Sequence, residues 1–140
     1  YKDRAATEEA LKGDWLHSGD SFVYDDEGFR IMVDRYKDIV KSGGENVSST
    51  RVEAILQQHP AIARAAVVGV PDDKWGEMVT ACVMVHDTAS FDAESVIAFA
   101  RERLAGYETP KRIEVMDAFP ETVGGKILKY KLRAALAEAG

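Results

Sequence analysis

A single lysine in a glycine-containing segment is the residue whose type and setting point most directly to chemistry. Lys126 follows Gly124 and Gly125 within the segment 120–127, and a basic stretch comes next at 129–133. Two glycines followed by a lysine predict a mobile loop that carries one positive charge. A compact ammonium group on a flexible stem is suited to a phosphate or a carboxylate that gains charge during a reaction.

Other interpretations of this segment have to be weighed. A lysine in a glycine turn is also common as a plain solvated turn residue. A phosphate-binding P-loop does not fit the spacing, because Pro120 occupies its first glycine position and Ile127 its Ser/Thr position. Lys126 therefore decides nothing alone, and its meaning depends on the rest of the chain.

The overall composition is that of an ordinary globular protein. The chain has 140 residues, of which 46% are hydrophobic and 30% charged, with a net charge of -6. This length supports one modest domain with a real core. The acidic balance argues against a broad nucleic-acid surface, which needs a basic face. No apolar run is long enough to span a bilayer, and no signal-peptide pattern opens the chain.

The single cysteine and the first residue bear on compartment and completeness. Cys82 is the only cysteine, so no intrachain disulfide or cysteine zinc cluster can form, which favours a reducing, cytoplasmic location. It lies in an apolar run, which predicts a small buried core residue in preference to a catalytic thiol. Because the chain begins at Tyr1 without an initiator methionine, we expect a fragment of a longer protein.

The N-terminal third predicts a helix and a hairpin. Thr7 can cap a short helix through about residue 12. Segments 22–24 and 29–33 flank an acidic glycine turn at 25–28, which is a hairpin signal. The turn lacks the spacing of a calcium loop, so we expect a solvated turn and no protein metal site. The charged segment 34–46 has no long apolar period and is predicted to be a connector.

The remainder alternates helices and strands. Thr50 and Glu53 have the spacing of a capping box at the start of a helix that ends near His59. The other expected elements are strands at 63–70, 78–85 and 112–116, and helices at 92–104 and 129–139. The fold class is therefore α+β, with a short mixed sheet flanked by helices in residues 36–140 and a β-hairpin tail in residues 1–35.

Four segments together carry a family resemblance. They are His-Ser-Gly-Asp at 17–20, the stretch 34–47 that contains Lys-Ser-Gly-Gly-Glu-Asn, Asp-Asp-Lys-Trp-Gly-Glu at 72–77, and the Lys126 segment. In this order and spacing the chain resembles the C-terminal part of the adenylate-forming (AMP-binding) enzymes over essentially its whole length. The resemblance implies that residues 1–35 end a large N-terminal adenylation domain and that residues 36–140 form the mobile C-terminal domain.

The resemblance also implies a two-step ligase reaction and roles for three residues. A carboxylate attacks the α-phosphate of ATP to give an acyl-adenylate and pyrophosphate, and the thiol of coenzyme A then displaces AMP. Lys126 matches the catalytic lysine of the adenylation step, where its charge bridges the substrate carboxylate and the α-phosphate. Asp20 matches the aspartate that accepts hydrogen bonds from the ribose hydroxyls, and Arg35 the arginine near ribose and phosphates.

Further residues match the hinge and the thioester step. Lys37 falls at the family's hinge, about which the small domain swings between the two half-reactions. The loop 42–44 looks like the loop that lines the pantetheine tunnel, where missing side chains let a ligand pass close to the backbone. Trp75 either packs on coenzyme A or is a partly buried structural residue. The residues expected to bind coenzyme A are Ser42, Gly43, Gly44, Trp75 and Tyr107.

The cofactors and partners follow from the same resemblance. We expect ATP, with Mg²⁺ bound mainly by the N-terminal domain, together with coenzyme A and a small carboxylic acid. The chain alone is expected to be inactive. Acetylation of Lys126 would remove its charge and silence adenylation, which makes a lysine acetyltransferase and deacetylase possible partners. Contact with a membrane is expected to be peripheral at most.

The chain departs from the family pattern at several positions. Asn-Val-Ser-Ser at 46–49 and Asp-Arg-x-Lys-Asp at 34–38 look most like acyl-CoA synthetases for medium-chain fatty or aryl acids. Glu121 and Gly124 replace the usual basic and Ser/Thr residues beside Lys126. Two alternatives remain: a non-catalytic interaction module that kept the fold, and an adenylation domain with another acceptor, as in peptide synthetases or luciferases.

Overall fold

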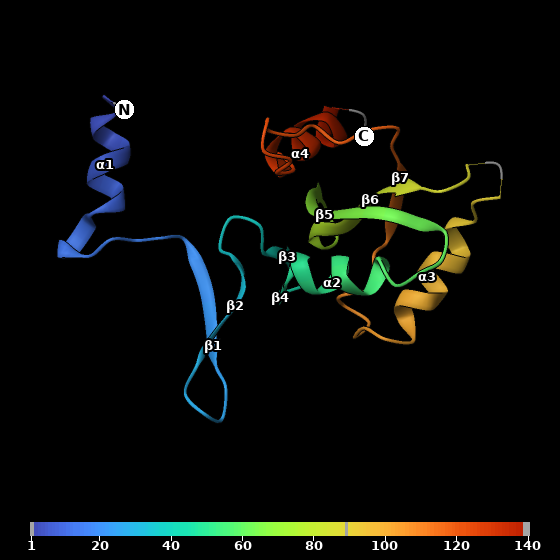
Figure 1. Cartoon of the computed structure of the whole chain (residues 1–140), viewed down its shortest axis with the longest axis horizontal. Coiled ribbons are helices and arrows are strands. Elements are labelled where there is room, and N and C mark those ends of the chain that lie inside the picture. Colours follow the sequence, from blue (N-terminus) through green and yellow to red (C-terminus); the bar gives the residue numbers. More distant parts are fainter. Residues whose placement is uncertain (1, 89, 139–140) are drawn as a thin grey trace. The chain divides into compact units, whose positions relative to one another are not determined.

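The computed structural model describes residues 2–88 and 90–138 and divides the chain into two compact units (Figure 1). The first unit runs from Tyr1 to Lys37 and the second from Asp38 to Gly140. The division falls two residues after the boundary expected from the sequence. Each unit has its own secondary structure, and they are described in turn.

The first unit consists of a short helix and a hairpin. Helix α1 spans Arg4–Ala10 and is capped by Asp3, whose side chain accepts from the Ala6 amide. The sequence placed the cap at Thr7, which was wrong: Thr7 lies inside the helix, and its hydroxyl donates to the carbonyl of Asp3. Asp3 caps the helix four residues before the predicted position, because its short carboxylate reaches the amide three residues further along the chain.

The hairpin of the first unit pairs β1, Asp20–Tyr24, with β2, Arg30–Arg35, in antiparallel register. The acidic turn between them is organised by Asp25, whose Oδ1 accepts from the amides of Glu27 and Phe29. This carboxylate therefore closes the turn by hydrogen bonding to the backbone. The register sets Asp20 opposite Arg35.

The second unit is built on a mixed five-stranded sheet, which confirms the predicted fold class. The long strands β5, Ile62–Asp72, and β6, Gly76–Val85, form an antiparallel pair. Two shorter strands share the other edge of β6: β3, Val40–Ser42, is antiparallel to it, and β7, Arg112–Val115, is parallel. Strand β4, Glu45–Val47, pairs with β3 at the end of the sheet.

Helices cover both faces of this sheet. Figure 1 shows α2, Ser49–Leu56, and α3, Ala93–Arg101, on one side of the β5–β6 pair and α4, Lys129–Glu138, on the other. Alternate residues of β5 enter the two cores, with Val67 facing α2 and α3 and Val68 facing α4. Because both faces are buried, the two long strands are almost continuously apolar.

Three local predictions in this unit were wrong or incomplete. The segment 34–46 is no connector, because it contains the end of β2, all of β3 and the start of β4. The cap of α2 is Ser48, whose hydroxyl accepts from the Arg51 amide, and not Thr50. Helix α3 ends at Arg101, three residues before the predicted end. The predicted end of the last helix, residue 139, lies outside the described residues.

Within the described residues, no helix is both long and apolar enough to cross a membrane.

Candidate functional site

The first unit carries a pocket that contains three of the predicted site residues. It has a volume of about 340 Å³ and is lined by Ser18, Gly19, Asp20, Arg35, Tyr36 and Lys37. The two strands of the hairpin bring these segments together, because the Tyr36 amide donates to the carbonyl of Gly19 at 2.9 Å. The pocket is therefore built on a hydrogen-bonded hairpin end and not on an unsupported loop.

Two of the residues that line this pocket form an ion pair. Nε of Arg35 is 3.4 Å from Oδ1 of Asp20. The amide of Arg35 donates to the side chain of Asp34 at 2.8 Å, which fixes the backbone where β2 ends. A carboxylate accepts from vicinal hydroxyls, and a guanidinium donates to phosphate oxygens. This donor and acceptor set suits a ribose phosphate.

The loop 42–44 of the second unit packs against Trp75. The amide of Gly43 donates to the Trp75 carbonyl at 2.8 Å. Gly43 has a φ of +60°, and a Cβ at this position would lie 3.1 Å from Cε3 of the indole. Both the backbone conformation and the close indole favour glycine here. The turn of the β3–β4 hairpin therefore runs directly over the tryptophan.

Trp75 is half-buried and is flanked by two ammonium groups. The Lys74 ammonium lies 4.8 Å, and that of Lys111 5.7 Å, from the indole ring centroid. The Lys74 and Trp75 amides both donate to Oδ1 of Asp72, which shapes the turn between β5 and β6. The indole thus has a structural contact with Gly43 and also lies beside positive charge that an anionic ligand would meet.

Tyr107 lies in a turn that Lys111 connects to the same tryptophan. Nζ of Lys111 donates to the carbonyl of Gly106 at 2.7 Å. Burial lowers the pKa of Lys111, and the nearby Arg101 charge lowers it further. The carboxylate of Glu108 stabilises the turn by accepting a hydrogen bond from the amide of Ala105. The structure thus places Gly43, Trp75 and the turn of Tyr107 in one neighbourhood.

Lys126 is exposed on a hydrogen-bonded hairpin turn. Glu121 and Ile127 form a β-bridge, and the Thr122 amide donates to the carbonyl of Lys126 at 2.9 Å. The turn closes through the Gly125 amide, which donates to the carbonyl of Thr122 at 2.9 Å. The sequence predicted a mobile loop for this segment, whereas the structure shows a closed turn. Thr122, which the sequence analysis had not singled out, supplies this closure.

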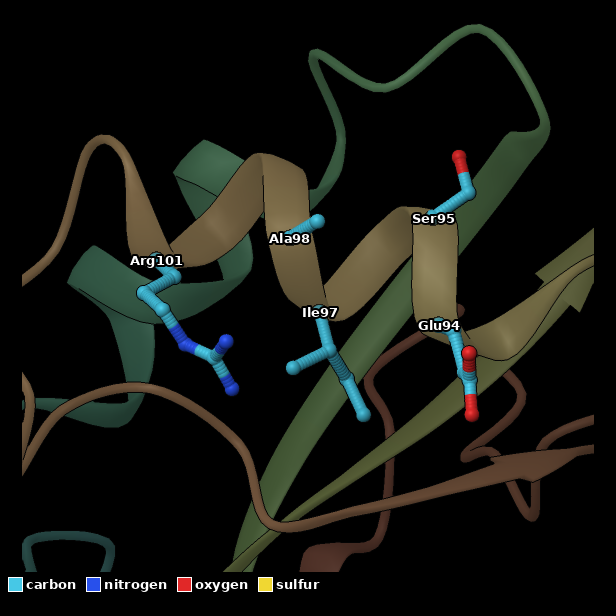
Figure 2. Close-up of a pocket in the computed structure, with 5 residues that line it drawn as sticks. All are labelled: Glu94, Ser95, Ile97, Ala98 and Arg101. Atoms are coloured by element: carbon cyan, nitrogen blue, oxygen red, sulfur yellow. The ribbon is translucent and has the colours of Figure 1, made fainter.

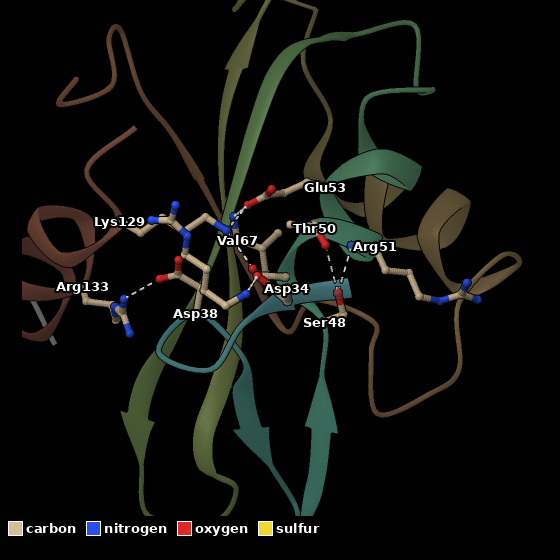
Figure 3. Close-up of polar contacts among 11 residues, drawn as sticks. Asp34, Asp38, Ser48, Thr50, Arg51, Glu53, Val67, Lys129 and Arg133 are labelled. Carbon is tan, nitrogen blue, oxygen red and sulfur yellow. Dashed lines mark hydrogen bonds and ion pairs between the residues drawn. The ribbon is translucent and has the colours of Figure 1, made fainter. Parts of the chain in front are cut away.

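Two polar contacts hold this hairpin and the helix after it. Glu121 forms an ion pair with Arg64 of β5, and the Arg64 guanidinium lies 5.4 Å from the ring centroid of Phe119. Nζ of Lys129 at the start of α4 lies 2.7 Å from Oε1 of Glu53 (Figure 3). The Lys126 turn therefore lies between two points that are fixed to other elements.

Glu53 and Lys129 join α2, β5 and α4 through contacts that the sequence did not predict. Oε1 of Glu53 also accepts from the Val67 amide of β5 at 2.7 Å, and Lys129 donates to the Ser49 hydroxyl at 2.7 Å. Arg133, one turn further along α4, pairs with Asp38 at 2.9 Å (Figure 3). The basic stretch after Lys126 was the available signal, because cations at three- and four-residue spacing on a helix share one face.

A second concavity lies along α3 and contains none of the predicted site residues. It has a volume of about 560 Å³, and the described residues that line it all belong to that helix (Figure 2). Glu94 and Arg101 lie at its two ends, with Ile97 between them (Figure 2).

This fold and these sites define a small α+β domain of the kind found at the end of adenylate-forming enzymes. The family model described as "AMP-binding enzyme C-terminal domain" matches residues 51–126. The chain belongs to this family, which confirms the resemblance predicted from the sequence.

Known proteins agree with this assignment. A feruloyl-CoA synthase of Amycolatopsis is 44% identical over 91% of this chain and 26% of its own length. The solved o-succinylbenzoate CoA synthetase of Bacillus subtilis, in complex with its acyl-adenylate, superposes with a TM-score of 0.85 at 35% identity, over 95% of this chain and 27% of the other. The amide bond synthetase McbA of Marinactinospora thermotolerans gives 0.83 at 40% identity, over 97% and 28%. The chain spans about a quarter of the length of these proteins.

Proposed function

We propose that this chain is the C-terminal part of an ATP-dependent acyl-CoA synthetase. The reaction joins a carboxylic acid to coenzyme A through an acyl-adenylate, with AMP and pyrophosphate as products. The observation that carries the proposal is the setting of Lys126. Its neighbours Lys129 and Arg133 are held in ion pairs, whereas Lys126 is exposed at a closed turn. Its ammonium group is therefore accessible to a ligand that binds at this turn.

In the first half-reaction, a carboxylate oxygen of the acid attacks the α-phosphorus of ATP and pyrophosphate leaves. Lys126 would stabilise the negative charge shared by the carboxylate and the α-phosphate. Asp20 would accept from the ribose hydroxyls, and Arg35 would donate to ribose or phosphate oxygens. Mg²⁺ would accompany ATP and be held mainly by the large N-terminal domain, which is the principal protein partner in this proposal.

In the second half-reaction, the thiol of coenzyme A loses its proton and attacks the acyl carbonyl carbon, and AMP leaves. The turn at 42–44 would line the path of the pantetheine arm, with Trp75 and Tyr107 nearby. The ammonium groups of Lys74 and Lys111 beside the indole support the binding of an anionic ligand. The proposed hinge is Lys37, which is the last residue of the first unit.

The substrate class that we propose is an aryl or fatty carboxylic acid. Two of the relatives described above are named for the ferulate and o-succinylbenzoate that they activate. The likeness to an amide bond synthetase supports a second candidate, in which the same adenylation step passes the acyl group to an amine. Both candidates carry out the same first half-reaction, and they differ only in whether coenzyme A or an amine accepts the acyl group.

The test uses the complete enzyme that contains this chain, with Lys126→Ala and the matched control Lys131→Ala, which removes an exposed lysine of α4. Adenylate formation is measured over a panel of aryl and fatty acids, and transfer is measured from preformed acyl-adenylate to coenzyme A or to an amine. We expect Lys126→Ala to lower adenylation by ~10²–10³-fold. The transfer rate of Lys126→Ala, and both rates of the control Lys131→Ala, should stay near those of the wild type.

The outcomes separate the candidates. Transfer to an amine but not to coenzyme A would replace the synthetase by the amide-forming enzyme. If the wild type activates no acid, or Lys126→Ala leaves adenylation unchanged, the non-catalytic interaction module becomes the better account.

A further inference from the structure

The carboxylate of Glu77 reaches from β6 to the backbone of β3. Its Oε2 accepts a hydrogen bond from the amide of Lys41 at 2.7 Å. On its other side β3 pairs with β4, and towards β6 its residue Ser42 lies opposite Gly76. The side chain of Glu77 therefore extends the contact between β3 and β6 by one residue, from the backbone pair Ser42–Gly76 to Lys41.

The room for this carboxylate is created by a glycine. A Cβ at residue 69 of β5 would lie 2.7 Å from Oε2 of Glu77, 2.8 Å from its Cδ and 3.0 Å from Cγ1 of Val40. Gly69 does not have a positive φ, so the backbone does not require glycine there. Space requires it, because the carboxylate occupies the place that a side chain of residue 69 would fill.

The contact belongs to a series that holds one loop. Residues 75–77 meet residues 41–43 at three consecutive points: Glu77 binds the Lys41 amide, Gly76 is opposite Ser42, and the Trp75 carbonyl accepts from Gly43. Glu77 supplies the only charged acceptor of these three points, and a hydrogen bond to a carboxylate is stronger than one between neutral groups. Its loss would free the start of the turn while leaving the later contact in place.

We propose that Glu77, seated in the space left by Gly69, is a positioning residue for acyl transfer. It fixes the backbone at Lys41 and thereby the path of the turn 42–44 along which the thiol arm of coenzyme A passes. The inference rests on the proposed function, since it assigns a task to a loop that serves the second half-reaction. It makes a directional claim: transfer depends on Glu77, and adenylation does not.

The experiment compares four variants of the complete enzyme: Glu77→Ala, Glu77→Gln, Gly69→Ala and, as control, Glu45→Ala, which removes an exposed carboxylate of the same hairpin. Both half-reactions are measured separately, with kcat and KM for coenzyme A in transfer. We expect Glu77→Ala and Gly69→Ala to lower kcat/KM for transfer about tenfold or more, with adenylation within about twofold. Glu77→Gln should retain more transfer than Glu77→Ala, because the amide oxygen can still accept from Lys41.

A second measurement tests the contact without catalysis. Amide hydrogen exchange at Lys41, followed by NMR on the 140-residue chain, should be slow in the wild type and faster in Glu77→Ala and Gly69→Ala. It should be unchanged in Glu45→Ala.

Each result decides the inference. Equal losses in both half-reactions, or unchanged transfer, would overturn it, as would unchanged exchange at Lys41. If the wild-type enzyme forms no acyl-adenylate, the proposed function itself has failed, and the role in transfer falls with it. A wild type that performs both half-reactions while Glu77→Ala matches it would refute only the role of Glu77.

Discussion

Arg35 and Asp20 lie opposite each other in the β1–β2 hairpin, with the guanidinium Nε 3.4 Å from a carboxylate oxygen. The backbone register produces this pairing, so the fold itself holds the two charges together. A preorganised pair loses less side-chain freedom on binding than two independent side chains would.

We expect both members of this pair to matter for ATP in the complete enzyme. Asp20→Asn removes the charge that accepts from hydroxyls, and Arg35→Lys removes the planar fork of donors. Each should raise KM for ATP in the adenylation assay about tenfold, which corresponds to about 1.4 kcal/mol of binding free energy. Asp26→Asn, in the exposed turn of the same hairpin, is the matched control. An unchanged KM for ATP in both variants would remove the pair from the nucleotide site.

The Glu53–Lys129 pair should contribute to stability. Both side chains are mostly buried, with 16% and 14% exposed. Glu53→Gln or Lys129→Met would remove one charge of a mostly buried ion pair, at a cost of about 3–5 kcal/mol in the free energy of unfolding. Urea unfolding of the chain measures this cost.

The double variant distinguishes a true pair from two separate effects. Because removing both charges leaves neither one unpaired, Glu53→Gln with Lys129→Met should cost less than the sum of the single variants. Additive costs would show that the two residues stabilise the protein independently.

The buried thiol of Cys82 predicts a dependence of stability on alkaline pH. Burial is the largest cause that raises its pKa, to about 11; the carboxylate of Glu114, its neighbour across β6 and β7, acts in the same direction and Arg112 in the opposite one. In the unfolded chain the thiol ionises near pH 9, so between about pH 9 and 11 the unfolded state binds fewer protons than the folded state. Stability is therefore lost as the pH rises through this window, by up to about 3 kcal/mol.

A comparison with Cys82→Ala isolates this contribution, because all the other side chains are the same in both proteins. Urea unfolding at pH 8 and pH 10.5 should show a steeper loss for the wild type than for the variant. Equal slopes would contradict a buried neutral thiol. At neutral pH the folded chain should also react slowly with a thiol reagent, because only a trace of thiolate is present.

The sequence predicted the elements whose pattern of apolar residues comes from burial alone. The apolar runs around Val67 and Cys82 predicted buried strands, and these strands form the centre of the sheet. The order of the predicted helices and strands indicated the α+β class, and the structure confirms it. The sequence did not predict the short elements. Three-residue strands such as β3 and β4 have too few residues to show a period, and β3 pairs with β6, which lies far from it in the chain.

The sequence proposes a set of site residues but does not reveal the contacts that these residues make. Glu53 was assigned to a capping box because of its spacing from Thr50, whereas the structure uses it to bind Val67 and Lys129. Local spacing cannot reveal a partner 76 positions away in the chain. Gly69 gave no sequence signal either, because its importance comes from the carboxylate that occupies the adjacent space.

Acetylation of Lys126 should separate the two half-reactions in the same way as its removal. Acetyl-lysine keeps the length of the side chain but has no charge, so the stabilisation of the adenylation transition state is lost. Enzyme that carries acetyl-lysine at 126, introduced during translation, should adenylate ~10²-fold or more slowly and transfer from preformed adenylate normally. Treatment with a deacetylase should restore adenylation. Normal adenylation by the acetylated enzyme would exclude this form of regulation.

The ion pair between Glu121 and Arg64 should tune adenylation through the orientation of the Lys126 hairpin. Both side chains are partly exposed, so breaking the pair should change the free energy of unfolding by less than about 1 kcal/mol. The hairpin, however, bears Lys126 five residues after Glu121, and a small displacement of an ammonium group weakens its contact with the reacting phosphate. We expect Glu121→Lys, which sets two cations together, to lower the adenylation rate about three- to tenfold while transfer is unchanged. The charge-reversed pair Arg64→Glu with Glu121→Arg should recover most of the loss. If the double variant is as slow as Glu121→Lys alone, the effect comes from the charge of residue 121 and not from its pairing with Arg64.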